Sequence, residues 1–251
     1  MDAKIFIIGH KPVDYGFWQN NLYQPIQVGN AEQFLPLRDN TGDNIAQWNE
    51  VFAENTAHYW VAHNTDYKYT GICQYRRRIY FDEDTDFDTL FENYYAIVPA
   101  PLFLSVDTVR QQYQMCHCKE DLDIVETIVK KLYPEYAEAW DNVINNGHLL
   151  FYSSSVMMRT QDFRDYVDFL YTVGCEWLRK KCLRTPDDVR RMVETDIKTG
   201  KRPYNNGGHE WQTVRYQTQV IGFLAERLLT FWLLKDNKPL MLIQYTKFEG
   251  V

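Results

Sequence analysis

The chain has 251 residues, of which 45% are hydrophobic, and its formal net charge of -7 excludes the strongly positive field that nucleic-acid binding requires. This length fits one large domain and is short for two. The five cysteines are an odd number in a mid-sized chain, so they argue against a disulfide framework and fit a reducing compartment.

Apolar runs and helical spacings alternate along the chain. Short apolar or β-branched runs predict strands at residues 4–9, 69–75, 95–99, 148–158 and 240–245. Apolar residues near helical spacing predict helices at residues 44–59, 122–132, 136–143, 163–178, 185–200 and 210–234. Asp43 is the expected N-cap of the first helix, and Thr185 caps the fifth. The alternation predicts an α/β fold with a mainly parallel central sheet and helices on both faces, in a single domain over residues 1–251.

Two segments bear on the location of the protein. The start, MDAKIFIIGHK, lacks the basic residues and the longer apolar run of a signal peptide. The most apolar window, residues 213–235, carries Arg215, Glu226 and Arg227, whereas a membrane span needs roughly 20 uninterrupted apolar residues. We therefore expect a cytoplasmic protein, and peripheral contact with the inner face of the cell membrane stays open.

Three consecutive arginines, Arg76 to Arg78, follow the predicted strand at residues 69–75. Ligands of open α/β sheets bind outside the carboxyl ends of strands, and Arg suits bidentate recognition of phosphate. In a continuing strand Arg76 and Arg78 would point one way and Arg77 the other, so at most two would reach one ligand. The alternative is a solvated charge run, or pairing with the acidic segment at residues 82–88.

Two further groups of polar residues lie next to predicted elements, one after the first strand and one before the first helix. His10 and Lys11 come directly after the first strand, where nucleotides commonly bind. Asp39, Asp43 and Asn44 precede the first helix and could hold a ribose or a base edge, although capping is the favoured role for Asp43. The chain has no P-loop, no Gly-x-Gly-x-x-Gly fingerprint and no Gly-x-Ser-x-Gly elbow, so the common nucleotide-binding and hydrolase folds are excluded.

A set of sequence blocks occurs in a familiar order along almost the whole chain. The blocks are His10-Lys11, Val28-Gly29, Asp43-Asn44-Ile45 with Asn49, Glu54 with Tyr59-Trp60, residues 71–77, His117 with Asp121-Leu122, residues 134–136 and residues 222–228. In this order they resemble the bacterial capsule and O-antigen glycosyltransferase domain, whose hallmark is a His-Tyr-Arg-Arg block. Two positions depart from that pattern, because Gln74 stands at the hallmark His and Ser154 at an Asn of a later strand.

The resemblance implies a GT-A-like fold and a hexosyltransferase. Its donor would be a UDP-sugar, with galactofuranose or galactose as the sugar. Its acceptor would be a saccharide or lipid-linked saccharide of a growing capsule, O-antigen or exopolysaccharide. Residues 1–100 would form the nucleotide-sugar-binding half and residues 101–251 the acceptor-side half. The alternative, kept open by Gln74 and Ser154, is a catalytically silent nucleotide-sugar-binding or assembly protein.

The candidate binding residues follow from these blocks and from the strand ends. The donor is expected to contact His10, Lys11, Asp39, Asp43, Asn44, Gln74, Tyr75, Arg76 and Arg77. The acceptor is expected to contact Ser154, His117 and Trp211.

A divalent metal could be held by paired carboxylates. Asp-x-Asp occurs between residues 82 and 88 and again at Asp121, but never at the tip of a predicted buried strand. The strand that ends in Asp-x-Asp in many GT-A enzymes ends here in Gln74-Tyr75-Arg76. We therefore expect no cofactor, with Mn²⁺ or Mg²⁺ disfavoured, and we expect Arg76 or Arg77 to neutralise the leaving diphosphate.

An inverting transfer needs one carboxylate as the general base on the acceptor hydroxyl. Glu210 is the first choice, because it lies beside the Gly207-Gly208 loop at the start of the last long helix. Asp121 and Glu226 are the rivals. Asp121 could instead cap its helix, and Glu226 could form a structural ion pair with Arg227.

Overall fold

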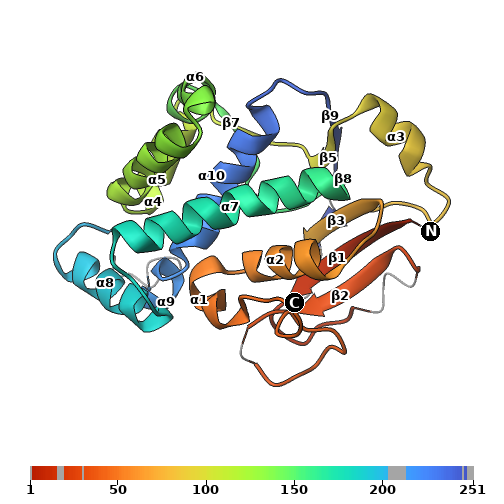
Figure 1. The fold of residues 1–251 in the computed structure, drawn as a ribbon, viewed down its shortest axis with the longest axis horizontal. Helices are drawn as coiled ribbons and strands as arrows, with labels where there is room; N and C mark the ends of the chain where they lie inside the picture. The colour runs from red at the N-terminus through yellow and green to blue at the C-terminus, as the bar shows by residue number, and fades with distance from the viewer. Residues whose placement is uncertain (1, 16–19, 30, 203–212, 245, 248–251) are drawn as a thin grey trace.

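A computed structural model describes residues 2–15, 20–29, 31–202, 213–244 and 246–247 (Figure 1). Its central sheet has the order β2-β1-β3-β8-β5-β9. The strands are β1 (Ala3–Gly9), β2 (Tyr23–Gln27), β3 (Tyr69–Gln74), β5 (Ala96–Pro99), β8 (Val156–Arg159) and β9 (Leu240–Ile243). Neighbouring strands are parallel except that β8 runs antiparallel to β3 and β5. The predicted mainly parallel α/β sheet is confirmed.

Helices cover both faces of the sheet, as predicted, but unequally. Helices α2 (Asn55–Asn64), α7 (Thr160–Lys180) and α10 (Val220–Leu234) pack on the face that Phe6 and Ile8 of β1 present (Figure 1). The opposite face, presented by Ile5 and Ile7, is covered by helix α3 (Phe87–Asn93) and by irregular segments. The alternation of side chains along a strand therefore divides the interior into two cores.

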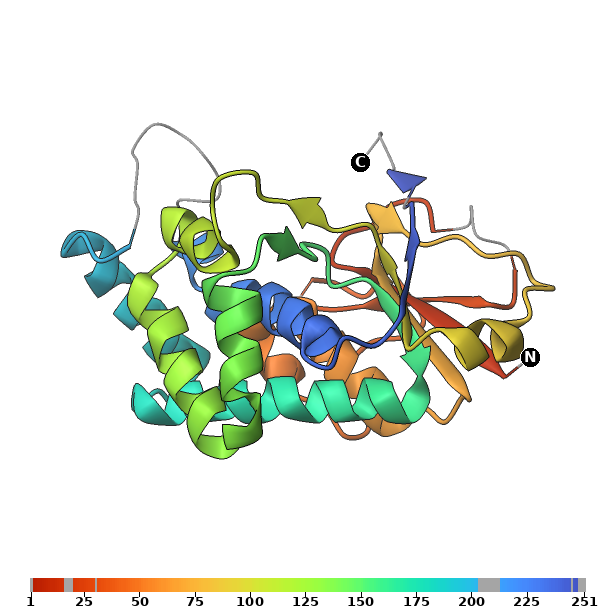
Figure 2. The same ribbon diagram turned by 90° about the horizontal axis from the view of Figure 1, so that it is seen from above.

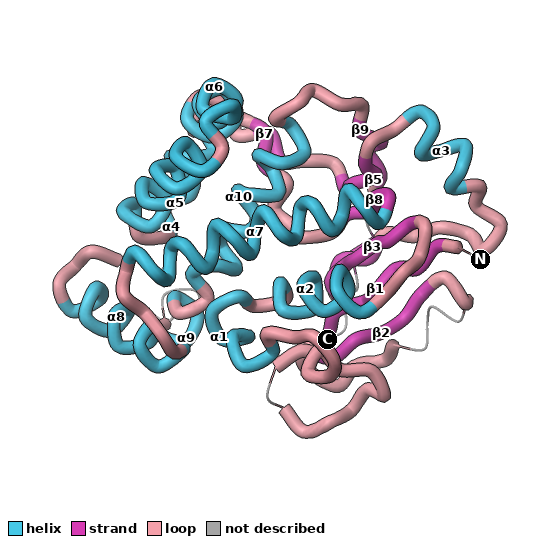
Figure 3. Tube along the Cα trace, in the orientation of Figure 1, coloured by secondary structure: helices cyan, strands magenta, loops and turns pink. Residues whose placement is uncertain are grey.

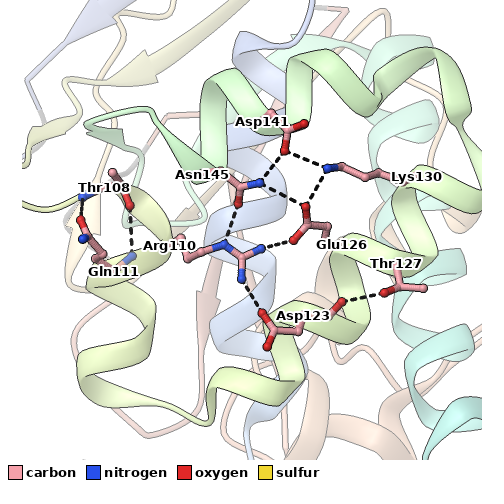
Figure 4. A network of polar contacts seen from close by, with 9 residues as sticks. All are labelled: Thr108, Arg110, Gln111, Asp123, Glu126, Thr127, Lys130, Asp141 and Asn145. Atoms are coloured by element: carbon pink, nitrogen blue, oxygen red, sulfur yellow. Dashed lines mark hydrogen bonds and ion pairs between the residues drawn. The ribbon is translucent and has the colours of Figure 1, made fainter.

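Beyond α7 and α10, a group of helices lies to one side of the sheet (Figure 2). It consists of α4 (Val109–Cys116), α5 (Lys119–Leu132), α6 (Ala137–Trp140), the turn η2 (Pro134–Tyr136) and the π-helix η3 (Asp141–Asn145). Arg110 contacts Asp123, Glu126 and Asn145, and Lys130 pairs with Glu126 at 2.7 Å (Figure 4). This polar network joins α4, α5 and η3.

The predicted helix at residues 44–59 is wrong as a single element. It is divided into the 3-10 turn η1 (Ala46–Trp48), α1 (Asn49–Phe52) and α2 (Figure 3). Ala53, with φ of 51°, ends α1, and both short helices bury apolar residues in the same core, so the spacing of those residues does not reveal the break. Asp43 is not the cap, since its side chain accepts a hydrogen bond from Tyr59 at 3.2 Å.

Two other predicted elements are also interrupted. The strand at residues 148–158 is divided into β7 (Leu149–Leu150), which pairs with β6 (Leu102–Phe103), and β8, because residues 151–155 leave the sheet. The helix at residues 210–234 is divided into α9 (Val214–Gln217) and α10 by a turn at Thr218, and residues 210–212 lie outside the described residues.

The remaining helix, α8 (Pro186–Lys198), begins with Thr185 in a capping box, which confirms the predicted start. Within the described part of the chain, no helix is long and apolar enough to span a bilayer.

Candidate functional site

The carboxyl ends of β1 and β3 lie at one edge of the sheet, and the antiparallel strand β8 begins at that edge. Ile72 of β3 pairs with Val156 of β8, so Gln74 and the segment at residues 153–155 are neighbours. Glu54, at the N-terminus of α2, reaches the same place. Elements far apart in the chain thus meet where a ligand of an open α/β sheet is expected.

Gln74 is the centre of a short chain of hydrogen bonds. Its Nε2 donates to Glu54 Oε1 at 2.5 Å, and its Oε1 accepts from Arg77 Nη1 at 3.4 Å. The Arg77 guanidinium lies 4.8 Å from the ring centroid of Tyr152, in the segment that leads to β8. Gln74 therefore joins a carboxylate to an arginine.

From the sequence, the three arginines were considered as part of a continuing strand, in which their side chains would alternate. The structure shows a turn at this place instead. Strand β3 ends at Gln74, and the chain turns back into β4 (Arg77–Arg78), where Gln74 pairs with Arg77. Arg78 is buried and donates to the carbonyl oxygens of Tyr75 and Asp14. Arg76 is exposed and Arg77 is half-buried, so these two are the arginines that a ligand can reach.

Positive charge gathers beside Arg76. Its guanidinium lies 5.2 Å from the ring centroid of Tyr75, and the Tyr75 ring meets His10 edge to face at 5.3 Å. Partial burial lowers the pKa of His10, and so do the positive charges of Arg76, Lys11 and Arg215. The predicted donor residues His10, Lys11, Tyr75 and Arg76 are thus brought together, and Arg215 of α9 joins them.

Glu226 of α10 lies near Glu54 and Arg77, on the helical side of the site. Its side chain is 25% exposed, and Oε2 accepts from Arg227 Nη1 at 2.8 Å. Burial is the main cause that raises the pKa of Glu226, and the charge of Glu54 adds to it, whereas Arg227 and Arg77 oppose the rise; together they bring the pKa to about 7. A carboxyl group that titrates near neutral pH and remains accessible is suited to proton transfer.

Arg227 holds Glu226 from the buried side. The same Nη1 that donates to Glu226 also donates to the carbonyl of Phe223 at 2.9 Å, and Nη2 donates to Gln112 of α4. Only 2% of Arg227 is exposed. Glu226 is therefore fixed by a side chain that is itself fixed on two sides.

His58 joins the start of α2 to the segment before β8. It is buried, its Nε2 lies 3.1 Å from the carbonyl oxygen of Ser154, and its Nδ1 lies 3.2 Å from that of Glu54. The hydroxyl groups of Ser154 and Ser155 are buried and have no hydrogen-bond partner among the described residues. Buried polar atoms are rarely left without a partner, so these two hydroxyls are an unusual feature of the segment before β8.

The predicted residues of the 38–44 loop separate into two groups. Asp39 is 1% exposed, its N–H donates to the Gln27 carbonyl at the end of β2, and burial raises the pKa of its carboxyl group. Asp43 instead bonds Asn64 at the C-terminal end of α2, and Asn44 braces its own turn through Gly42. Because α2 has 10 residues and a helix rises about 1.5 Å per residue, these two lie about 15 Å from its Glu54 end.

The other predicted catalytic and acceptor residues lie elsewhere. His117 is buried and stacks on Phe223 at 4.1 Å, and burial with the charge of Arg227 lowers its pKa to about 3, so it is neutral at physiological pH. Asp121 is buried in an ion pair with Arg202 at 2.7 Å, and Arg202 also bonds Asp196 at 3.1 Å. Glu210 and Trp211 lie outside the described residues.

Several residues of the site were not predicted from the sequence. Glu54 received no role, and His58 and Arg215 carried no signal of their own. Tyr152 was a possible stacking surface for a sugar or uracil, although core packing was the favoured role for any single aromatic residue. Their importance depends on where α2, α9 and residues 151–155 lie relative to β3. Among the residues that the structure describes, no group of three or more His, Cys, Asp or Glu side chains gathers as a metal site.

Comparison with known proteins identifies the fold and the family. The chain matches the apo structure of the WbbM bifunctional glycosyltransferase over 99% of its own length, with a TM-score of 0.72 and 24% sequence identity, and it spans 45% of the WbbM chain. No curated protein matches the chain at a significant level. A family model described as a domain of unknown function, DUF4422, matches residues 4–193. The chain therefore has the fold seen in part of WbbM and belongs to the DUF4422 family.

Proposed function

We propose that this protein is an inverting glycosyltransferase that moves a hexose from a UDP-sugar to a growing surface polysaccharide. The observation that carries the proposal is an accessible carboxyl group, Glu226, which titrates near neutral pH opposite Arg77, at the carboxyl edge of a sheet with the fold of a glycosyltransferase. Galactofuranose and galactose are the first donor sugars to test.

The donor is placed by the polar groups along the sheet edge. Asp39, whose N–H bonds the last residue of β2, has a buried carboxylate oxygen without a described partner, which suits the hydroxyl or N–H donors of a nucleoside. Arg76 and Arg77 would contact the diphosphate, because one guanidinium group can donate two parallel hydrogen bonds to two phosphate oxygens. His10 and Lys11, which follow β1, lie on the same side of the proposed donor site as Arg76.

The reaction then needs one proton acceptor. Glu226 takes the proton of an acceptor hydroxyl while that oxygen forms a bond to the anomeric carbon of the donor. The bond from this carbon to the diphosphate oxygen breaks, and its electron pair leaves with UDP, where Arg76 and Arg77 meet the growing charge. The acceptor is proposed to lie near Ser154, in the segment that leads to β8.

Glu226 is preferred to Asp121 because of their surroundings. Asp121 is fully buried in its ion pair with Arg202, whereas a quarter of the Glu226 side chain is exposed. Glu210 remains the rival, and the two are separated by substitution with Gln at each position.

The test measures UDP release from a panel of UDP-sugars, with and without saccharide acceptors. Glu226→Gln should lower kcat at least about 10²-fold, the usual contribution of a general base, while stabilisation of the protein by UDP is retained. Glu92→Gln is the matched control, because Glu92 is an exposed carboxylate on α3. Normal turnover of the Glu226→Gln protein would refute the assignment of the base.

The silent-protein alternative gives a different result. UDP would raise the melting temperature of the protein, but no UDP-sugar would be consumed. If UDP, GDP and CMP all fail to change the melting temperature, the nucleotide-sugar proposal is wrong as a whole.

A further inference from the structure

Helix α10 approaches the end of α1 more closely than side chains normally allow. A Cβ atom built on Gly222 of α10 would lie 2.8 Å from the Cβ of Ala53, and 3.6 Å from the carbonyl oxygen of Phe52. Two aliphatic carbons normally approach no closer than about 3.5 Å. The contact therefore exists only because residue 222 has no side chain.

Ala53 has an unusual backbone conformation at this contact. Its φ of 51° and ψ of -135° lie outside the regions that L-residues normally adopt. Its carbonyl oxygen accepts from Asn49 Nδ2 at 2.8 Å and from Thr56 Oγ1 at 3.2 Å, so α1 and α2 hold the corner from both sides. The corner directs the next residue, Glu54, toward Gln74.

Both residues of the contact are tied to a carboxylate of the site. Glu226 follows Gly222 by four residues in α10, which places the two on the same face of the helix, and Glu54 follows Ala53 directly. The charges of Glu54 and Glu226 also interact, as the higher pKa of Glu226 shows. A change in the distance between the backbones at residues 53 and 222 must change the distance between the two carboxyl groups.

We propose that Ala53 and Gly222 are positioning residues, whose contact sets the separation of Glu54 and Glu226 and hence the position from which Glu226 meets the acceptor hydroxyl. This inference rests on the proposed function, because it assigns that position to the proton-transfer step. One added methyl group would have to push α10 about 1 Å away from α1 to reach an ordinary contact distance. A misplacement of about 1 Å can lower the rate of a positioned reaction about 10²-fold.

The experiment is a double-mutant cycle with Gly222→Ala, Ala53→Gly and the double variant. Gly222→Ala should lower kcat about 10-fold to 100-fold with little change in KM for the UDP-sugar. Ala53→Gly removes the methyl group on the α1 side of the contact but keeps the corner, because glycine accepts a positive φ, and its kcat is the reference for the double variant. The double variant should recover most of the lost kcat, because the atom that obstructs the new methyl group is gone.

The pH dependence of kcat separates positioning from general damage. A wider gap weakens the repulsion between the carboxylates and admits water, and both effects lower the pKa of Glu226. The acid limb of the pH profile should therefore move to lower pH in Gly222→Ala and return in the double variant. Alanine is also a better helix former than glycine, so a loss of activity is not explained by a weaker α10.

Several outcomes overturn the inference. An unchanged kcat and pH limb in Gly222→Ala would do so, and so would a loss that Ala53→Gly fails to restore. If Gly222→Ala does not fold, the double variant decides, because an inactive folded double variant contradicts the proposal. If Glu226→Gln is inactive but Gly222→Ala is normal, only the positioning role falls. If Glu226→Gln is fully active, the proposed base itself is wrong.

Discussion

Glu226→Gln should stabilise the protein at alkaline pH while it lowers kcat at least about 10²-fold. The folded protein raises the pKa of Glu226 from 4.5 to about 7, so between these values the native carboxyl group keeps a proton that the unfolded chain releases. The contribution of the protonated Glu226 carboxyl group to the free energy of unfolding is therefore complete below pH 4.5 and is lost as the pH rises through 7. The difference corresponds to about 3 kcal/mol at pH 8.5, and exposure of a quarter of the side chain reduces the expected gain to between about 1 and 3 kcal/mol.

The assay is urea unfolding followed by the fluorescence of the seven tryptophans, at pH 5.5 and at pH 8.5. The free energy of unfolding of the Glu226→Gln protein should exceed that of the wild type by less at pH 5.5 than at pH 8.5, because part of the wild-type carboxyl group is still protonated at the lower value. Glu92→Gln should show no such pH dependence. Equal differences at both pH values, or a Glu226→Gln protein that is less stable at pH 8.5, would refute the reasoning.

The other predictions concern the phosphate site, metal dependence and a buried ion pair. Arg77→Ala should raise KM for the UDP-sugar and lower kcat, whereas Arg159→Ala, an exposed arginine at the other end of β8, should do neither; equal effects would contradict a diphosphate contact at Arg77. Turnover should persist in excess chelator, and activity that strictly requires manganese or magnesium would remove the arginine-only proposal. Arg202→Met should lower the free energy of unfolding by about 3 kcal/mol, because it leaves the buried Asp121 with Lys181, 3.7 Å away, as its remaining charge partner. A normal unfolding curve for Arg202→Met would show that this pair is not structural.

Local patterns in the sequence predicted the elements that depend on local signals. Strand β1 is a continuous apolar run, and α8 begins at a Thr185-Pro186 start whose capping box the structure confirms. The break at Ala53 and the antiparallel direction of β8 were not predicted, because neither has a local signal in the sequence. Ala53 interrupts a helical spacing that continues in register on both sides, and the antiparallel direction of β8 depends on how residues 151–155 cross the sheet edge, which no local window contains.

The candidate site was predictable in the same partial way. Arg76 and Arg77 were predicted because they follow a buried strand. His10 and Lys11 were predicted because they follow the first strand. The sequence did not separate Glu226 from Asp121, since both are acidic residues within helices. Their difference arises from tertiary contacts, namely Arg202 beside Asp121 and the partly open surroundings of Glu226.

The order of strands in the sheet has a consequence for synthesis of the protein. Strand β8, at residues 156–159, lies between β3 and β5, and β9, at residues 240–243, completes the far side of β5. A nascent chain that has emerged only to residue 100 holds β3 and β5 without the strand that separates them, and both expose unpaired backbone edges that invite aggregation. Residues 1–100 and 101–251 are therefore interleaved pieces of one sheet, and the sheet is complete only after residue 243 has left the ribosome.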